Sequence, residues 1–461
     1  MSNLTQELAS FTVDTKYDDL PAIAVHEAKF LLLDSIGCAL AGITSDPGKM
    51  AIALARRLGG PPESSIIGVG DKVSCSNAVF ANGQLINTPD YDALMPGGHA
   101  PPYIVPPVLA MAESTGGSGM DLILATALGF EVSARVGSGA QSASPTGTRA
   151  FRWSDRQGYA HCNFGAAAGA GKLLKLDRDK MTHALGIAGH LCQVLTWVRY
   201  SFSEHRPMTK YGVPGWQNTG GVMAVLLAEM GYMGDTTIFE PPEHGFWKFC
   251  GYDEWHAERV MEGIGETWLF TRVNYKPYPC CRVLHPALEC LRSIMDQNNL
   301  MPEDIDSVRA FLPKPVEAPC FTNRELTNIV DVQFGLPYVL AIIAHGVMTG
   351  AEWQDLDAVR EPEILEFAGK VSLQVHPETE KKPQLTTIEV IAKGKTFKEE
   401  RTLPRGAWAE GLQMTDDELM EKFSHNASRI LTQDKIKGAV KVLLELEKVE
   451  NISELIKQIT L

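Results

Sequence analysis

Two changes in residue pattern, near positions 269 and 404, constrain the fold of this chain most strongly. The residues before 269 are rich in Ala, Gly, Leu and Met, and their apolar side chains recur at helical spacing. Between 269 and 403, short segments rich in β-formers alternate with helical segments, and the residues after 404 are helical again. The sequence therefore predicts a mainly α protein with an inserted α+β domain.

These changes also set the expected domain boundaries. We expect a large all-helical domain built from both chain ends, residues 1–268 and 404–461, and a smaller α+β lid domain of residues 269–403. A helical tail as short as the last segment does not bury enough apolar surface to fold alone, so we expect it to dock on the first domain. The length of 461 residues agrees with a chain of two or three domains.

Helical spacing and turn residues place the individual elements. Small residues recur at contact spacing in 163–174 (NFGAAAGAGKLL), which predicts closely packed helices. Lys393, Gly394 and Lys395 predict the turn of a hairpin between 387–392 and 396–401. Further strands are expected at 307–311 and 371–375. Helices are expected at 22–41, 48–58, 76–86, 120–136, 163–176, 179–195, 215–230, 285–296, 334–344, 355–367, 416–423, 434–447 and 452–459.

Charge and composition exclude several function classes. The formal net charge of −14 disfavours nucleic acid and anionic membranes as partners. The most apolar stretch, 30–43, contains Asp34 and is shorter than the about 18 residues that a membrane span needs. The chain starts without a secretory signal and has nine cysteines, so we expect reduced thiols and a cytoplasmic protein.

Motifs that bind metals or organic cofactors are absent from the sequence. The chain has no HExxH or paired CxxC motif, no GxGxxG after a strand and no GxSxG elbow. The glycine-rich stretch 165–173 lacks the spacing and the hydroxyl residue of a phosphate-binding loop. What remains is acid–base chemistry without metal or cofactor, or no chemistry.

The segment 89–102 (PDYDALMPGGHAPP) concentrates titratable side chains in one irregular loop. Asp90 and Asp92 are followed by His99, and Pro89 and Pro96 prevent a helix from continuing through the loop. A carboxylate beside an imidazole provides a proton acceptor and a proton donor that work near neutral pH. The alternative is a solvated loop with ordinary charges.

Three further segments combine titratable residues with turn residues. They contain His161, Lys210, and the pair Lys276 and Arg282 at the boundary between the domains. The cations offer the local positive charge that an anionic ligand needs in an acidic protein. The alternatives are a helix-capping role for His161 and a surface position for Lys276. The polar stretch 141–159 carries three arginines and is either a lid or an unstructured loop.

The order and spacing of several short motifs resemble the MmgE/PrpD family over nearly the whole chain. The motifs are 32–42 (LLDSIGCALAG), 81–83 (ANG), 90–92 (DYD), the His161 segment, 209–210 (TK), 275–279 (YKPYP) and 337–338 (PY). The family includes 2-methylcitrate dehydratase, cis-aconitate decarboxylase and iminodisuccinate epimerase. The resemblance implies a homodimer with a cleft between two domains and no metal or organic cofactor.

The resemblance also assigns roles to individual residues. It implies acid–base or substrate-binding positions at Asp90, His99, His161 and Lys210, and at Lys276 and Tyr338. We add Arg282 and Cys281 as candidate substrate-binding residues. Several departures from the family pattern argue most against a cis-aconitate decarboxylase. Ala93 and Leu94 replace the usual Asp-Thr pair, Ala100 and Pro101 replace the usual Pro-Ser after His99, and Cys281 stands where the decarboxylase has a second pocket histidine.

These observations lead to one expected function with two alternatives. We expect a cofactor-independent hydro-lyase, similar to 2-methylcitrate dehydratase, that acts next to a carboxylate of a small di- or tricarboxylic acid. In this interpretation His99 is the general acid/base, Asp90 holds His99, and Lys210 and Lys276 bind carboxylates. His161 is the second proton carrier and Tyr338 a hydrogen-bond donor. The alternatives are an epimerase or decarboxylase of a related acid, and a non-catalytic protein that binds a small acid.

Overall fold

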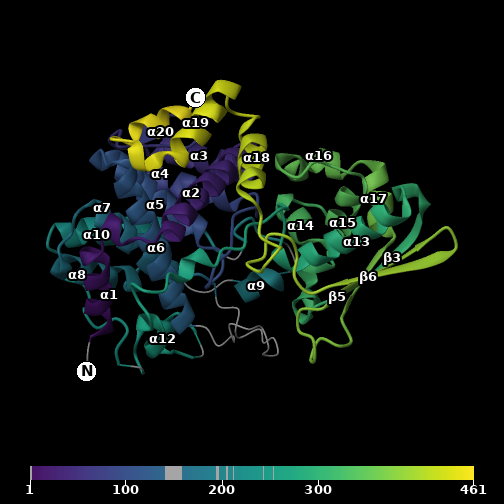
Figure 1. Cartoon of the computed structure of the whole chain (residues 1–461), viewed down its shortest axis with the longest axis horizontal. Helices are drawn as coiled ribbons and strands as arrows, with labels where there is room; N and C mark the ends of the chain where they lie inside the picture. The colour runs from purple at the N-terminus through teal and green to yellow at the C-terminus, as the bar shows by residue number, and fades with distance from the viewer. Residues whose placement is uncertain are drawn as a thin grey trace.

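The chain forms two lobes, each around its own hydrophobic core (Figure 1). The computed structural model describes residues 3–140, 158–193, 197–203, 206–210, 212–241, 243–252 and 254–461. The first core takes residues from both chain ends, up to Tyr275 and again from Leu419. The second core is formed by residues 278–392 together with Tyr200. The fold is therefore mostly helical with a small mixed sheet, while the domain limits at 268/269 and 403/404 stay predictions.

The first lobe consists of helices. It contains α1 (Leu4–Asp14), α2 (Ala22–Gly42), α3 (Asp46–Leu58), α4 (Cys75–Asn87), α5 (Pro101–Thr115), α6 (Gly119–Gly139), α7 (Cys162–Leu173), α8 (Arg178–His190), α9 (Trp197–Ser201), α10 (Pro214–Glu229), α11 (Phe246–Phe249) and α12 (Ala257–Met261). Of these helices, α2, α3, α4, α6, α7, α8 and α10 lie close to expected positions, whereas α1, α5, α9, α11 and α12 were not expected. A short ribbon pairs β1 (Ser64–Ser65) with β2 (Lys72–Val73). The candidate lid at 141–159 lies outside the described residues, except for its last two positions.

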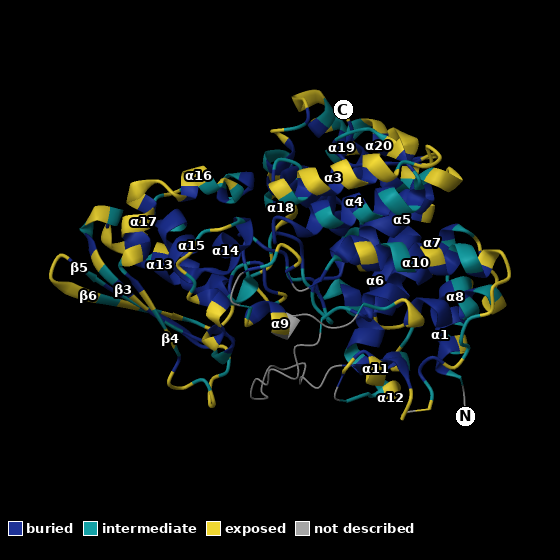
Figure 2. Ribbon diagram, turned by 180° about the vertical axis from the view of Figure 1, so that it is seen from behind, coloured by how far each residue is buried: buried dark blue, intermediate teal, exposed yellow. Residues whose placement is uncertain are grey.

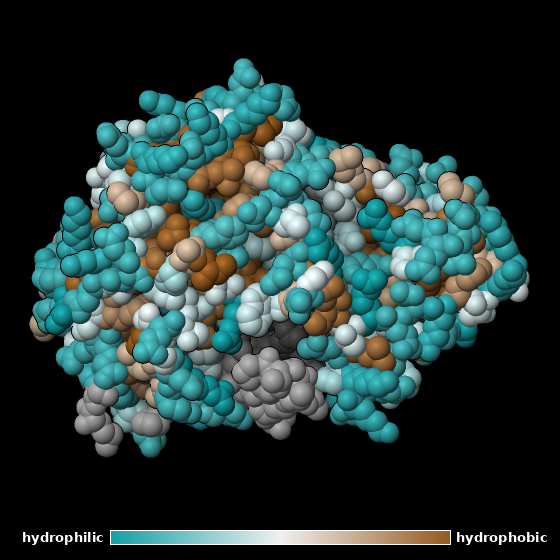
Figure 3. All heavy atoms as spheres, viewed as in Figure 1, coloured by the Kyte–Doolittle hydropathy of each residue, from teal (hydrophilic) through white to brown (hydrophobic). Residues whose placement is uncertain are grey.

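The second lobe packs helices on a four-stranded sheet in the order β4-β3-β5-β6. Its strands are β3 (Ile305–Leu312), β4 (Val371–Val375), β5 (Thr386–Ala392) and β6 (Lys395–Arg401), and only β3 and β4 are parallel. Its helices are α13 (His285–Asn298), α14 (Ile329–Phe334), α15 (Leu336–Ala344), α16 (Leu356–Val359) and α17 (Pro362–Gly369). The face of this lobe that is turned to the viewer in Figure 3 is mostly hydrophilic.

The expected hairpin between β5 and β6 is confirmed. Ala392 pairs with Lys395, so only two residues form the turn. Both have positive φ, 52° at Lys393 and 70° at Gly394. This is the signature of a type I′ turn, whose twist matches the twist of the two strands that it joins.

Small residues bring α6 and α7 into close contact. A Cβ atom on Gly165 would lie 2.2 Å from the carbonyl oxygen of Gly129, and one on Gly169 would lie 2.8 Å from that of Ala125. Larger side chains at these positions would force the helices apart. The close helix packing predicted from 163–174 is therefore confirmed, and Figure 2 shows α6 and α7 as mostly buried.

Helix α5 was not expected, because its sequence contains four prolines. Pro101 and Pro102 occupy the first turn, where no intrahelical N–H donor is needed. Pro106, in the helix interior, provides no N–H for the carbonyl of Pro102. The side chain of Asn218 on α10 donates to that carbonyl instead, at 2.6 Å. A tertiary contact thus satisfies the backbone acceptor that the proline leaves open.

The C-terminal helices return to the first lobe, as expected. They are α18 (Asp416–Ala427), α19 (Gln433–Leu444) and α20 (Ser453–Gln458), and they lie over the helices of the N-terminal half (Figure 1). The ammonium group of Lys29 on α2 binds the carbonyl of Leu444 at 2.8 Å and the carboxylate of Glu447 at 3.0 Å. On α2, Gly37 allows Phe423 of α18 to approach closely.

Within the described residues, no single helix has the length and apolar character to cross a membrane. Helices α2 and α3 meet these criteria only as a pair, and they are bent by 94° at the break between them.

We predict that Asn218→Ala lowers the free energy of unfolding by about 1–3 kcal/mol, because the buried carbonyl of Pro102 loses its donor. Chemical denaturation measures this change. Thr219→Ala is the control, since the Thr219 hydroxyl binds the Gly215 carbonyl within its own helix. Equal unfolding free energies for the two variants would contradict the compensating role of Asn218.

Candidate functional site

The loop 89–102 is buried rather than solvated. Asp90 and Asp92 have no exposed surface, and His99 is 6% exposed. The loop leaves α4 and enters α5, and on the way its Leu94 pairs with Asn274, in the segment that leads to the second lobe. Leu94 N donates to Asn274 O at 2.9 Å, and Asn274 N donates to Leu94 O at 2.7 Å. The solvated-loop interpretation is therefore wrong.

Asp90 lies between two buried lysines, and we call Asp90, Lys210 and Lys276 the Asp90 cluster. The ammonium group of Lys276 donates to Asp90 Oδ2 at 2.9 Å and to the Asp90 carbonyl at 2.8 Å. The ammonium group of Lys210 lies 3.3 Å from Asp90 Oδ1 and donates to the carbonyl of Asn87 at 2.6 Å. Because Lys276 has no exposed surface, its interpretation as a surface lysine is wrong.

Two ammonium groups share one carboxylate in this cluster, and the charge of the neighbouring Asp92 also acts on Lys210. Burial lowers the pKa of Lys210, the charge of Lys276 lowers it further, and Asp90 opposes the decrease. Asp90 and Lys210 also have positive φ, 53° and 48°, which is uncommon outside glycine. Left-handed backbone at non-glycine residues and a buried lysine with a lowered pKa are together typical of a functional site.

The carboxylate that binds His99 belongs to Asp92, not to Asp90 as expected. The distance between His99 Nδ1 and Asp92 Oδ2 is 2.8 Å. The expected pairing fails because both oxygens of Asp90 face the lysines. An ionised carboxylate only accepts, so the Nδ1 proton of His99 points to Asp92, and Nε2 is the nitrogen that accepts a proton.

His161 lies beside this pair, at the start of α7. The ring of Tyr159 is 5.8 Å from the ring of His99 and 6.3 Å from that of His161. His161 Nδ1 lies 3.1 Å from the hydroxyl of Tyr252, and Nε2 is buried without a hydrogen-bond partner among the described residues. Burial lowers the pKa of His161 to about 4, so the imidazole is neutral at pH 7.

Arg282 and Cys281 lie where the chain crosses between the lobes. The guanidinium of Arg282 donates to the carbonyls of Tyr275 and Arg405, both at 3.2 Å, and thereby holds the two crossing segments together. Burial lowers its pKa to about 10. Cys281 is half-buried, and its backbone N–H donates to Gln333 O at 2.9 Å. These contacts fix the crossing, and a substrate-binding role for either residue stays a prediction.

Tyr338 lies on α15 in the second lobe and is buried. Burial raises the pKa of its hydroxyl, and the charged groups that act on it are Arg324, Asp331 and Glu325. None of these belongs to the Asp90 cluster. Its role as a hydrogen-bond donor to substrate stays a prediction.

Sequence reasoning missed a second buried ion pair next to the site. Lys422 on α18 lies 2.6 Å from Asp34 Oδ1 on α2. Asp34 interrupts the apolar stretch 30–43, and Lys422 lies beside Leu419 and Phe423 on the buried face of α18. This was the available signal, because buried charges of opposite sign pair with each other.

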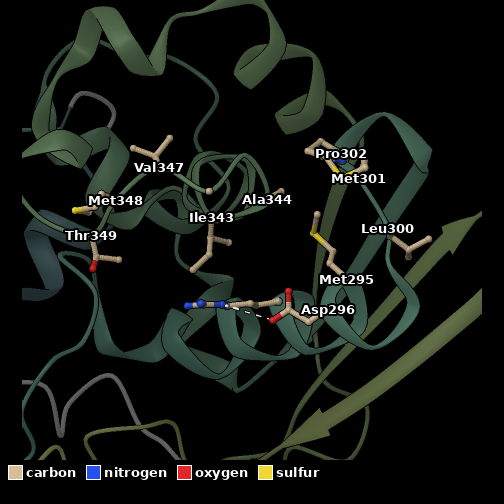
Figure 4. Close-up of a pocket in the computed structure, with 12 residues that line it drawn as sticks. Met295, Asp296, Leu300, Met301, Pro302, Ile343, Ala344, Val347, Met348 and Thr349 are labelled. Carbon is tan, nitrogen blue, oxygen red and sulfur yellow. Dashed lines mark ion pairs between the residues drawn. The ribbon is translucent and has the colours of Figure 1, made fainter. Parts of the chain in front are cut away.

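The described residues also line a cavity of about 450 Å³ in the second lobe (Figure 4). It lies between the end of α13 and the turn after α15, and Met295, Met301 and Met348 give it an apolar wall. Its charged groups, Arg292 and Asp296, pair with each other at 3.7 Å. No predicted site residue lines this cavity. Among the described residues, no three His, Cys, Asp or Glu side chains are grouped as metal ligands.

Two family models match the sequence. The MmgE/PrpD N-terminal domain matches residues 6–258, and the MmgE/PrpD C-terminal domain matches residues 278–446. The chain belongs to the MmgE/PrpD family. The resemblance inferred from the motifs is thus confirmed, including its extent over nearly the whole chain.

Relatives in the MmgE/PrpD family include cis-aconitate decarboxylases. That of Aspergillus terreus is 25% identical over 491 residues, covering 99% of this chain and 96% of the relative. That of Homo sapiens is 25% identical over 482 residues, covering 99% and 94%. That of Mus musculus is 24% identical over 481 residues, covering 99% and 93%. Family and relatives support a lyase-type enzyme that acts on carboxylic acids.

We predict that Gly97→Ala destabilises the protein by at least about 1 kcal/mol more than Gly231→Ala. Both glycines have positive φ, 98° and 92°. A Cβ at Gly97 would lie 2.7 Å from His161 Nε2, whereas nothing lies within 4 Å of one at Gly231. Equal losses in chemical denaturation would contradict the contact between the site loop and His161.

We predict that the protein loses stability in acid because of His161. The folded-state pKa of His161, about 4, is below the ordinary value of 6.5. The unfolded chain therefore binds more protons, and stability present above pH 6.5 is lost as the pH falls toward 4. Between pH 7.5 and 5 the loss is about 2 kcal/mol.

Chemical denaturation at the two pH values, on the wild type and on His161→Gln, measures this contribution. The wild type is expected to lose about 2 kcal/mol more than the variant. Equal losses would show that His161 titrates normally in the folded protein.

Proposed function

We propose that this protein is a cofactor-independent lyase that acts next to a carboxylate of a small di- or tricarboxylic acid. One observation carries the proposal: two buried ammonium groups share Asp90, and the Asp92–His99 pair follows in the same loop. Lysine ammonium groups bind carboxylates and stabilise negative charge that develops on them. A histidine held by a carboxylate removes or returns a proton near neutral pH.

In the proposed reaction, Lys210 and Lys276 bind a substrate carboxylate, and His99 Nε2 removes a proton from the carbon beside it. The electron pair moves into the carboxylate, which gains enolate-like character, and then forms a carbon–carbon double bond as the carbon–oxygen bond breaks. The hydroxyl group of this carbon–oxygen bond takes a proton and leaves as water. In a one-base route His99 returns this proton. In a two-base route the proton passes through His161, whose neutral ring accepts a proton before it donates one.

Dehydration of a 2-methylcitrate-like acid is the first candidate. It agrees with Cys281, which stands where the decarboxylase has a second pocket histidine. Decarboxylation is the second candidate, and the names of the relatives favour it. Epimerisation of a related acid uses the same carboxylate-binding groups. The alternative from another class of function is a homologue that binds a small acid but catalyses no reaction.

A panel of hydroxy and unsaturated di- and tricarboxylates separates these candidates. Ultraviolet absorbance reports a new double bond, carbon dioxide release reports decarboxylation, and deuterium incorporation without net conversion reports epimerisation. No reaction with any acid, combined with a thermal shift by one of them, would favour the non-catalytic alternative. The proposal would be refuted if none of the acids reacted and none of them bound to the protein.

The homodimer implied by the family resemblance is part of this proposal. The outer face of α10 supports it, because Trp216, Met223 and Met230 recur every seven residues and are 66%, 45% and 81% exposed. Figure 2 shows α10 on the surface. Light scattering of the purified protein distinguishes a monomer from a dimer.

We predict that His99→Gln lowers kcat by about 10²–10⁴-fold on the substrate that the panel identifies. Lys210→Ala is expected to lower it by about 10²–10³-fold, because the developing negative charge loses a counter-charge. Steady-state kinetics measures both effects.

Two matched variants control for loss of a histidine or a partly buried lysine elsewhere. His183→Gln and Lys172→Ala remove side chains that bind backbone carbonyls in other parts of the first lobe. Full activity of His99→Gln and Lys210→Ala would rule out the assigned roles.

A further inference from the structure

We propose that Lys422 is a positioning residue: from α18, its ammonium group holds together the two backbone segments that carry Asp90, Asp92 and Lys276. The inference rests on the proposed function in that these segments are taken to form the active site. Lys422 itself binds no substrate in this proposal.

The ammonium group donates to two backbone carbonyls, that of Tyr91 at 2.8 Å and that of Lys276 at 3.0 Å. It also forms an ion pair with Asp34, whose Oδ1 lies 2.6 Å away. The ammonium group also lies 3.8 Å from the centre of the Tyr91 ring. With a side chain that is 4% exposed, Lys422 has little access to water and depends on these partners.

The two bound carbonyls belong to the segments on which the site depends. Tyr91 lies between the two carboxylates of the loop, and its hydroxyl donates to Pro277 O at 3.2 Å. Lys276 is the residue whose side chain binds Asp90. The ammonium nitrogen of Lys422 therefore fixes the distance between the backbone at Tyr91 and the backbone at Lys276.

Asp34 completes this arrangement from α2. Its Oδ1 balances the charge of Lys422, and its Oδ2 accepts from the backbone N–H of Ala93 at 3.2 Å. The side chain of Asp34 has no exposed surface. Burial raises its pKa, and Lys422 opposes this rise. Both ends of the loop 91–93 are thus tied to the same buried ion pair.

The consequence for catalysis is geometric. A displacement of about 1 Å in a reacting group lowers a rate by about 10²-fold. If the contacts of Lys422 are lost, the loop 89–102 and the backbone around Lys276 separate, and kcat falls more than KM rises. Loss of folding stability alone would instead reduce the amount of folded protein without changing its kcat.

The test uses three variants of the full chain. Asp34→Asn/Lys422→Met removes both charges, so that no unpaired charge is buried, and the amide oxygen introduced at position 34 can still accept from the backbone N–H of Ala93. Lys422→Arg keeps the charge but cannot place three donors on one nitrogen. Lys29→Met is the control, because Lys29 also binds a carbonyl and a carboxylate between α2 and the C-terminal region, away from the site.

Hydrogen exchange measured by mass spectrometry tests the positioning role of Lys422 without any substrate. The amides of Leu94 and Asn274, which bond to each other's carbonyls, are expected to exchange at least about tenfold faster in both Lys422 variants and at the wild-type rate in Lys29→Met. With an active acid in hand, kcat is expected to fall at least about tenfold in both Lys422 variants only.

Wild-type exchange at these amides in both Lys422 variants would overturn the positioning role. Exchange that increases equally in Lys29→Met would assign the effect to general loosening and would also overturn it. A wild-type protein that neither converts nor binds any acid would refute the proposed function alone, because the exchange measurement decides on Lys422 without it.

Discussion

The burial of charged groups is the constraint on which the rest of this structure depends. An isolated carboxylate in the protein interior costs several kcal/mol, so each buried charge requires a partner at hydrogen-bond distance. Asp90 pairs with two lysines, Asp92 pairs with His99, and Asp34 pairs with Lys422. Because these partners come from distant segments, the pairing fixes the relative positions of α2, the loop 89–102, the lobe crossing and α18.

The crossing between the lobes is tied to the site by backbone contacts. Leu94 of the loop pairs with Asn274, and the guanidinium of Arg282 joins the outgoing segment to the returning one at Arg405. Lys276 lies between these two contacts along the chain. A movement of the second lobe would therefore displace Lys276 and with it the Asp90 cluster. No side chain of the sheet has to contact the cluster for this to occur.

The fold could be predicted to a large extent because helical spacing and turn residues act locally. The hairpin at Lys393 and Gly394 and the packing of α6 on α7 follow from a few neighbouring residues. Helix α5 could not be predicted, because Asn218, more than a hundred positions away, satisfies the carbonyl that Pro106 leaves without a donor. The sequence identified Asp90, His99, Lys210 and Lys276 as candidates, but their pairing depends on backbone turns at Asp90 and Lys210 that no local pattern encodes.

The position of Lys422 on α18 has a consequence for biosynthesis. The ribosome adds this residue after all other members of the buried charge network. Until α18 leaves the exit tunnel, the carbonyls of Tyr91 and Lys276 lack their shared donor and Asp34 lacks its counter-ion. The first lobe can collapse earlier, but its charged interior is complete only after α18 has been synthesised.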